Sequence, residues 1–215
     1  MEINLITLWD ILIHVDKYLT YIIQNYGIAT YLIIFLIIFC ETGLVVTPFL
    51  PGDSLIFVLG ALAASGEINT LAIGGVLMLA SIIGNICNYE IGKFIGPRAF
   101  ESQNPRLFKK EYLVRTHEFF EKHGGKTIVI ARFMPIIRTF APFVAGIGQM
   151  DYRRFLFYNL VGCVAWVLTF MIGGYSFGNI PAVERNFTLV IIGIILISLL
   201  PAVIASIRQS KPHNN

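Results

Sequence analysis

Charged residues are scarce in this sequence. Asp, Glu, Lys and Arg make up 13% of its 215 residues, whereas about a quarter of a typical soluble domain is charged. Apolar residues make up 56%, so the chain has neither the low hydrophobicity of a disordered protein nor the composition of a soluble enzyme. The 16 Lys and Arg are too few to follow a phosphate backbone, which argues against a nucleic-acid binder. The composition favours helices packed in lipid, where the 19 glycines permit close approach.

Cysteine and histidine are few and poorly placed for metal or covalent chemistry. Cys40, Cys87 and Cys163 are odd in number, lie in apolar stretches and lack CxxC spacing. We therefore expect no disulfide framework, no metal site and no cofactor. The four histidines lie near the chain ends or in a polar loop, and no Ser-Gly-His run occurs. A membrane lipid phosphatase, which would need a nucleophile such as histidine, is therefore a minor alternative.

Uninterrupted apolar runs of spanning length are also few. A membrane-spanning helix needs about 20 residues, and residues 71–95, 155–176 and 187–207 each meet that requirement. The apolar run at 28–40 has only 13 residues and reaches spanning length only by including Glu41. We therefore expect an all-α polytopic membrane protein with about four spanning helices.

Proline and glycine interrupt the next apolar segment, residues 44–64. Pro48, Pro51 and Gly52 break its helical pattern, and the segment is too short to cross the membrane twice. Irregular backbone is tolerated at membrane depth only where it is buried in protein or lines a wet cavity. We interpret this segment as a re-entrant hairpin.

Residues 127–150 repeat this pattern. The segment is apolar but holds Pro135, Pro142 and Gly146 together with two arginines, which a simple spanning helix would accommodate poorly. We interpret it as a second re-entrant hairpin. Two facing hairpins that enter from opposite sides of the membrane would form inverted-topology repeats.

A short sequence echo between the two hairpins agrees with a repeat. Phe49-Leu50-Pro51 resembles Phe133-Met134-Pro135, and Gly60-Ala61 resembles Ala145-Gly146. The echo is weak, and the repeat prediction therefore rests on the topology.

The remaining segments define the organisation of the chain. We expect an amphipathic N-terminal segment at 1–26, one transmembrane domain at 27–207, and a polar loop at 97–126 that contains a second amphipathic helix. A tail follows at 208–215. The flanks that we assign to the cytoplasm carry eleven Lys and Arg and the opposite flanks carry one, which predicts that both termini are cytoplasmic.

Small and polar residues recur every four positions in the 71–95 segment. Gly84, Asn88, Gly92 and Gly96 share one helical face. A face of this kind is suited to packing against another helix in the membrane.

Four ionisable residues occur where the membrane makes charge expensive: Glu41, Asp53, Arg132 and Arg138. Each would cost about 2.5–3.5 kcal/mol at the bilayer centre, so we expect them to face one another near the midplane. One interpretation is a pair of structural salt bridges between the hairpins. The other, which we favour, is a transport site in which arginines grip a phosphate group and the carboxylates carry protons.

The same residues resemble the signature of the DedA family, also called SNARE-associated or VTT-domain proteins. In the second half the resemblance is carried by Arg132, by the run from Phe133 to Thr139, and by Ala141-Pro142 and Ala145-Gly146. In the first half it is carried by Glu41, Pro48, Pro51-Gly52-Asp53, Tyr89 and Gly92. Many members have an acidic residue in the helix where this chain has Asn85 and Asn88, which leaves a proton role for that helix unsupported.

The resemblance implies an inner-membrane flippase for a lipid phosphate, chiefly recycling undecaprenyl phosphate with dependence on the proton motive force. It implies that the essential acidic pair maps to Glu41 and Asp53, and the essential arginines to Arg132 and Arg138. The expected partners are the lipid substrate, protons or another coupling ion, and membrane lipids. A phospholipid scramblase and a cation/proton antiporter remain alternatives, because the same charges would serve either.

Overall fold

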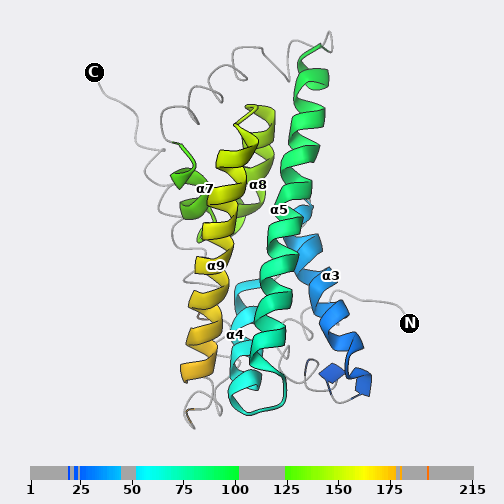
Figure 1. Ribbon diagram of the computed structural model, residues 1–215, viewed down its shortest axis with the longest axis vertical. Helices are drawn as coiled ribbons and strands as arrows, with labels where there is room; N and C mark the ends of the chain where they lie inside the picture. The colour runs from blue at the N-terminus through cyan, green and yellow to red at the C-terminus, as the bar shows by residue number, and fades with distance from the viewer. Residues whose placement is uncertain are drawn as a thin grey trace. The chain divides into compact units, whose positions relative to one another are not determined.

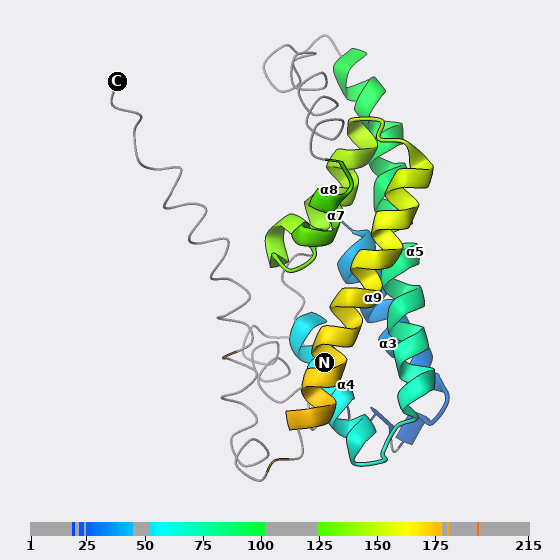
Figure 2. The same cartoon turned by 60° about the vertical axis from the view of Figure 1, so that its left-hand side comes forward.

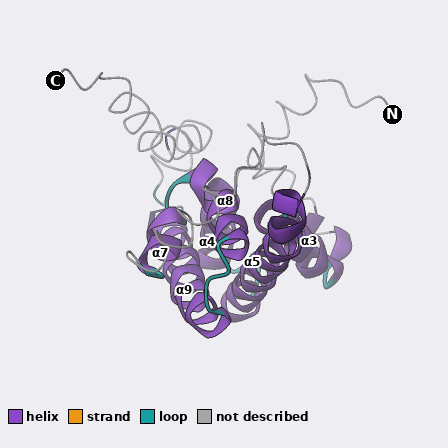
Figure 3. Cartoon of the chain, turned by 90° about the horizontal axis from the view of Figure 1, so that it is seen from above, coloured by secondary structure: helices purple, strands orange, loops and turns teal. Residues whose placement is uncertain are grey.

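The computed structural model describes residues 19, 22–23, 25–44, 52–101, 124–177, 180 and 193. All regular secondary structure in these residues is helical, as Figure 3 shows. The helices are α3 (Ala29–Gly43), α4 (Gly52–Ala64), α5 (Thr70–Glu101), α7 (Lys126–Ala131), α8 (Pro135–Ile147) and α9 (Tyr152–Phe177).

Two of these helices are long and apolar enough to cross a membrane. They are Thr70–Gly96 within α5 and Tyr152–Phe177, which is α9, the long green and yellow helices of Figure 1. Each has a mean hydropathy of 2.0 over its most apolar window, and together they confirm two of the predicted spans as helices. Leu79, Phe94 and Phe157 are exposed large apolar side chains on these helices, as expected for helices in lipid.

Several predicted features lie outside the described residues. These are most of the N-terminal segment 1–26, the loop residues 102–123, nearly all of the span 187–207, the tail 208–215, Pro48 and Pro51. What the sequence predicts for these segments stays a prediction.

The chain divides into two compact units. Unit 1 comprises residues 1–36, 50–77 and 167–215, and unit 2 comprises residues 37–49 and 78–166. Helix α4 belongs to unit 1 and helices α7 and α8 to unit 2, while α3, α5 and α9 contribute residues to both.

In unit 1, α4 packs against α9 through glycine on both sides. A Cβ added to Gly60 would collide with the Met171 carbonyl, and one added to Gly174 would collide with the Phe57 carbonyl. The two backbones therefore approach directly, which side chains at these positions would prevent. Nearly every residue of α4 is buried, including Asp53 in its first turn.

In unit 2, α8 packs against α5 in the same way. A Cβ added to Gly146 would collide with the Tyr89 carbonyl, and one added to Gly92 would collide with the Phe143 carbonyl. Tyr89 is also buried against Phe155 of α9, and the two rings stack with centroids 4.3 Å apart. The Tyr89 hydroxyl donates a hydrogen bond to the Met150 carbonyl oxygen at 2.5 Å.

The two units thus share one packing pattern. In each unit, the glycine of one helix lies against a backbone carbonyl of the other helix, and that carbonyl belongs to the residue three positions before the other helix's own glycine. The four pairs are Phe57 and Gly60, Phe143 and Gly146, Met171 and Gly174, and Tyr89 and Gly92. This pattern supports an internal repeat. It pairs Gly60 with Gly146, whereas the sequence echo pairs Gly60 with Ala145.

The second predicted hairpin segment forms two short helices, α7 and α8, separated by Arg132, Phe133 and Met134 (Figure 2). Pro135 is the first residue of α8, where its missing N–H group costs no helical hydrogen bond. Pro142 and Gly146, which were also predicted to shape the hairpin, both lie inside α8. Gly146 provides the close contact with α5.

Candidate functional site

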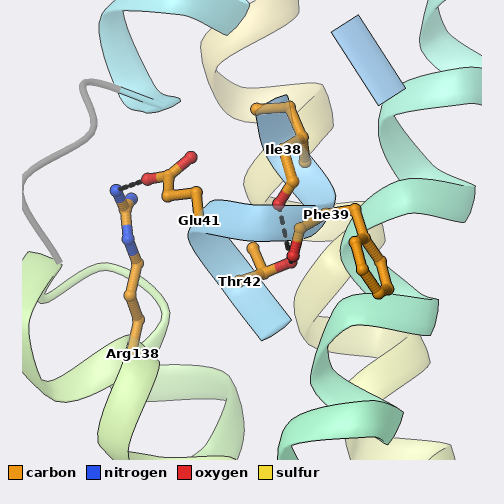
Figure 4. A network of polar contacts seen from close by, with 5 residues as sticks. All are labelled: Ile38, Phe39, Glu41, Thr42 and Arg138. Carbon is orange, nitrogen blue, oxygen red and sulfur yellow. Dashed lines mark hydrogen bonds and ion pairs between the residues drawn. The ribbon is translucent and has the colours of Figure 1, made fainter. Parts of the chain in front are cut away.

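A buried ion pair lies between α3 and α8 in unit 2. Arg138 Nη2 donates to Glu41 Oε1, and Figure 4 shows the guanidinium group reaching from α8 toward the carboxylate of α3. The Glu41 side chain is fully buried and that of Arg138 is 5% exposed. The sequence places Glu41 in the last turn of α3, and the start of α8 at Pro135 places Arg138 in the first turn of α8.

Asn88 of α5 fixes the backbone on both sides of this ion pair. Its Nδ2 donates to the carbonyl oxygen of Thr42 at 3.1 Å and to that of Thr139 at 2.7 Å. Thr42 directly follows Glu41 and Thr139 directly follows Arg138, so one amide group ties both partners of the pair to α5. The Thr42 hydroxyl donates to the Ile38 carbonyl within α3 at 2.8 Å (Figure 4).

The predicted small and polar face of α5 is confirmed by these contacts. Gly84 lies against Thr42 and Gly43 of α3, while Gly92 and Gly96 lie against α8. Asn88, on the same face, bonds to both helices.

The guanidinium group of Arg132 has different surroundings. Arg132 is the C-terminal cap of α7 and is 3% exposed. Its Nη2 donates to Asn159 Oδ1 at 3.2 Å, to Cys163 Sγ at 2.5 Å and to the Ser81 carbonyl oxygen at 3.4 Å. All three acceptors are neutral. Within unit 2, as far as the structure describes it, Arg132 has no carboxylate partner, and its buried Nε has no hydrogen-bond partner.

Asn159 of α9 is the centre of this neutral network. Besides Arg132, its Oδ1 accepts hydrogen bonds from Asn85 Nδ2 at 2.7 Å and from Cys163 Sγ at 3.2 Å. Its Nδ2 donates to the Ile82 carbonyl oxygen at 3.2 Å, which fixes the orientation of the amide. The side chain is fully buried, so its hydrogen bonds are shielded from water.

Trp166 connects the two arginines. The guanidinium carbon of Arg132 lies 5.5 Å from the centroid of the Trp166 ring, and that of Arg138 lies 5.2 Å from it. Both distances are within the range of a cation–π interaction, which contributes about 0.5–2 kcal/mol. The two guanidinium carbons therefore lie within about 11 Å of each other around a fully buried ring.

Of the four predicted site residues, the structure brings three into one unit. Glu41, Arg132 and Arg138 belong to unit 2, whereas Asp53 belongs to unit 1, where it is buried. Sequence reasoning did not assign Ser81, Asn159 or Trp166 to the site. A signal for these residues exists, because Asn159, Cys163 and Trp166 stand at positions i, i+4 and i+7 of one helix, as do Ser81, Asn85 and Asn88 of another.

Comparison with known proteins gives a consistent assignment. Residues 50–176 match the VTT domain. The chain is 52% identical to protein DedA of Escherichia coli (strain K12) over 204 residues, which cover 94% of this chain and 93% of that protein. It is 42% identical to an uncharacterized membrane protein of Mycobacterium tuberculosis (strain ATCC 25618 / H37Rv) over 184 residues, covering 85% and 81%.

A more distant relative is the inner membrane protein YqjA of Escherichia coli (strain K12), which is 33% identical over 151 residues, covering 70% of this chain and 69% of YqjA. No solved structure matches the chain. The domain match covers more than half of the chain, and the DedA relative aligns over nearly all of it. The chain therefore belongs to the DedA family of VTT-domain membrane proteins.

Proposed function

We propose that this protein is a membrane transporter that flips a lipid phosphate between the two leaflets. The observation that carries the proposal is the pair of buried arginines, Arg132 and Arg138, against the single ring of Trp166. Buried charge in a membrane protein is costly and is retained mainly where it serves a substrate or ion. Arginine stays charged at physiological pH, and its planar fork matches a phosphate group.

The ion pair supports a mechanism in which the headgroup and Glu41 compete for Arg138. In the resting protein Glu41 balances the charge of Arg138. A proton on Glu41 would remove the negative charge, and Arg138 would then be available to the phosphate group. Asp53, a buried carboxyl group of unit 1, is proposed to take part in the same proton-linked cycle. No bond in the lipid is made or broken, so the proposal is transport and not enzymatic catalysis.

We further propose that the lipid is undecaprenyl phosphate, recycled through an inner membrane with both termini of the protein in the cytoplasm. The lipid is proposed from the DedA family resemblance, and the coupling to the proton motive force from the family together with Glu41 and Asp53. The topology is proposed from the excess of Lys and Arg in the 97–126 loop and its neighbouring flanks.

Reconstitution into vesicles tests the proposal. Labelled undecaprenyl phosphate and a labelled phospholipid would be added separately, with and without a pH gradient, and the fraction flipped would be measured over time. The proposal expects pH-dependent flipping of the phosphate lipid. Replacing the exposed Arg153 with Gln is the control for loss of an arginine outside the site. Equal flipping of both lipids without a gradient would favour a scramblase, and flipping of neither with cation-dependent proton movement would favour an antiporter.

A further inference from the structure

We infer that Asn159 is a positioning residue that holds the Arg132 guanidinium with a neutral amide, so that the anionic headgroup supplies the negative charge. The inference rests on the proposed function, because the headgroup is the phosphate of the transported lipid. It assigns different roles to the two arginines. In unit 2, Arg138 is balanced by Glu41, whereas Arg132 is held for the substrate.

The hydrogen bonds of Asn159 determine which atom faces Arg132. Donation from Nδ2 to the Ile82 carbonyl turns Oδ1 toward the guanidinium group. Oδ1 then receives hydrogen bonds from Arg132, Asn85 and Cys163. An oxygen that accepts from three donors, one of them a guanidinium group, is a site that a carboxylate would fill with stronger bonds.

The neutral amide has an electrostatic consequence. Asp has nearly the same shape as Asn, but at this position it would form an ion pair with Arg132 inside the protein. Because Arg132 has only neutral acceptors in the described part of unit 2, its charge attracts an incoming anion. The buried Nε, which has no hydrogen-bond partner among the described residues, is a donor that a phosphate oxygen can use.

The contacts of Nη2 also hold the guanidinium group of Arg132 in place. This nitrogen is close to Ser81, Asn159 and Cys163, which hold that edge of the guanidinium plane against α5 and α9. Gly162 of α9 lies beside the aliphatic part of Arg132, where an added Cβ would come within 3.4 Å of its Cδ. The side chain is therefore fixed along its length, from its Cδ beside Gly162 to its Nη2 against α5 and α9.

Ligand-dependent stabilisation of the purified full-length protein tests the inference. The melting temperature in detergent would be measured with farnesyl phosphate and with the uncharged alcohol farnesol. N159D and C163D each add a carboxylate beside Arg132, while N159A and C163S are neutral variants at the same positions. We expect each acidic variant to weaken the response to farnesyl phosphate at least about tenfold in apparent affinity relative to the neutral variant at the same position.

The pH dependence separates charge from loss of packing. Lowering the pH neutralises the introduced carboxyl group, so the ratio of N159D to wild-type affinity should rise, because a neutral carboxyl resembles the amide. The ratio for C163S should stay constant. The ratio to wild type cancels the titration of farnesyl phosphate itself. A pH-independent ratio for N159D, equal to that for N159A, would show a packing defect and overturn the inference.

R132Q and R138Q provide a test that does not depend on folding of the acidic variants. Without ligand, R132Q should lose less stability than R138Q, because R138Q takes a cation away from the buried Glu41 carboxylate. Equal losses would overturn the inference. Undiminished binding by N159D and C163D would also overturn it while leaving the proposed function intact. A wild-type protein that responds equally to farnesyl phosphate and farnesol would instead contradict the proposed function itself, and the inference with it.

Discussion

Arg138 and Glu41 stand 97 positions apart in the sequence and form a buried ion pair between the first turn of α8 and the last turn of α3. Thr42, next to Glu41, and Thr139, next to Arg138, both accept hydrogen bonds from Asn88 of α5. The ion pair therefore lies where three helices meet. The contact is therefore both part of the fold and the element of the site that a proton can change.

Neutralising Glu41 alone should destabilise the protein. E41Q leaves the buried Arg138 without this negative charge, and breaking one side of a buried ion pair costs about 3–5 kcal/mol. The double variant E41Q/R138Q should lose less stability than the two single variants together, because neither position of the pair then carries an unpaired buried charge. Thermal unfolding in detergent measures all three. Additive losses would show that the two side chains are not energetically coupled.

Replacing either arginine with lysine should impair transport even though the charge is kept. A lysine ammonium group does not reproduce the planar fork, and loss of one charge-assisted contact costs about 1.5–3 kcal/mol, about tenfold or more in affinity. R132K and R138K would be reconstituted at matched protein amounts and assayed with labelled lipid phosphate. Wild-type rates in both variants would remove the arginines from the binding site.

Substitution of Trp166 should reduce ligand binding more than substitution of a buried aromatic residue elsewhere. W166L removes the ring that faces both guanidinium groups, and W166F keeps a weaker aromatic face. We expect ligand-dependent stabilisation to decrease in the order wild type, W166F, W166L. F155L is the matched control, since Phe155 is equally buried but stacks on Tyr89. A control that loses as much ligand response as W166L would show a general packing effect.

The glycine contacts between α5 and α8 should tolerate no methyl group. G92A and G146A each place a Cβ against a backbone carbonyl of the other helix, and overpacking of this kind costs about 1–3 kcal/mol. G75A in α5 is the control, because a Cβ there meets nothing within 4 Å. Since alanine is a better helix former than glycine, G75A should keep or raise the melting temperature. Unchanged melting of G92A and G146A would contradict the close contact.

A cysteine at position 115 should be labelled only from the cytoplasm. The excess of Lys and Arg in the 97–126 loop predicts this side, and R115C would report it with a membrane-impermeant thiol reagent. The three native cysteines lie in apolar stretches, and the unsubstituted protein serves as the background control. Labelling in intact cells before permeabilisation would reverse the predicted orientation.

The charged part of the site could be predicted from sequence because charge is rare in apolar segments. Glu41, Asp53, Arg132 and Arg138 stand out for that reason. The expected charge balance predicts that opposite charges face one another, but only the structure shows that Arg138 pairs with Glu41. The α5 and α9 spans were predictable from their length. Their ends were less so, because α5 continues to Glu101 through residues that read as a polar loop.

The neutral part of the site could not be predicted in this way. Asn159, Cys163 and Trp166 are unremarkable in a spanning segment, because buried polar and aromatic residues serve packing in many helices. Only the register of α9 against α7 shows that they face Arg132. The role of Gly146 was likewise hidden, since a glycine near two prolines reads as part of a turn until its contact with Tyr89 is seen.

The glycine contacts also bear on how far sequences of this fold can diverge. Because α5 and α8 meet through the backbone at Gly92 and Gly146, their separation does not depend on the size of any side chain at those points. Side chains on the outer faces, such as Phe94 and Phe140, can then change in volume without moving Arg138. Substitutions should therefore accumulate on the lipid-facing surface at little cost, which would let the protein adapt to membranes of different composition while its polar interior keeps its geometry.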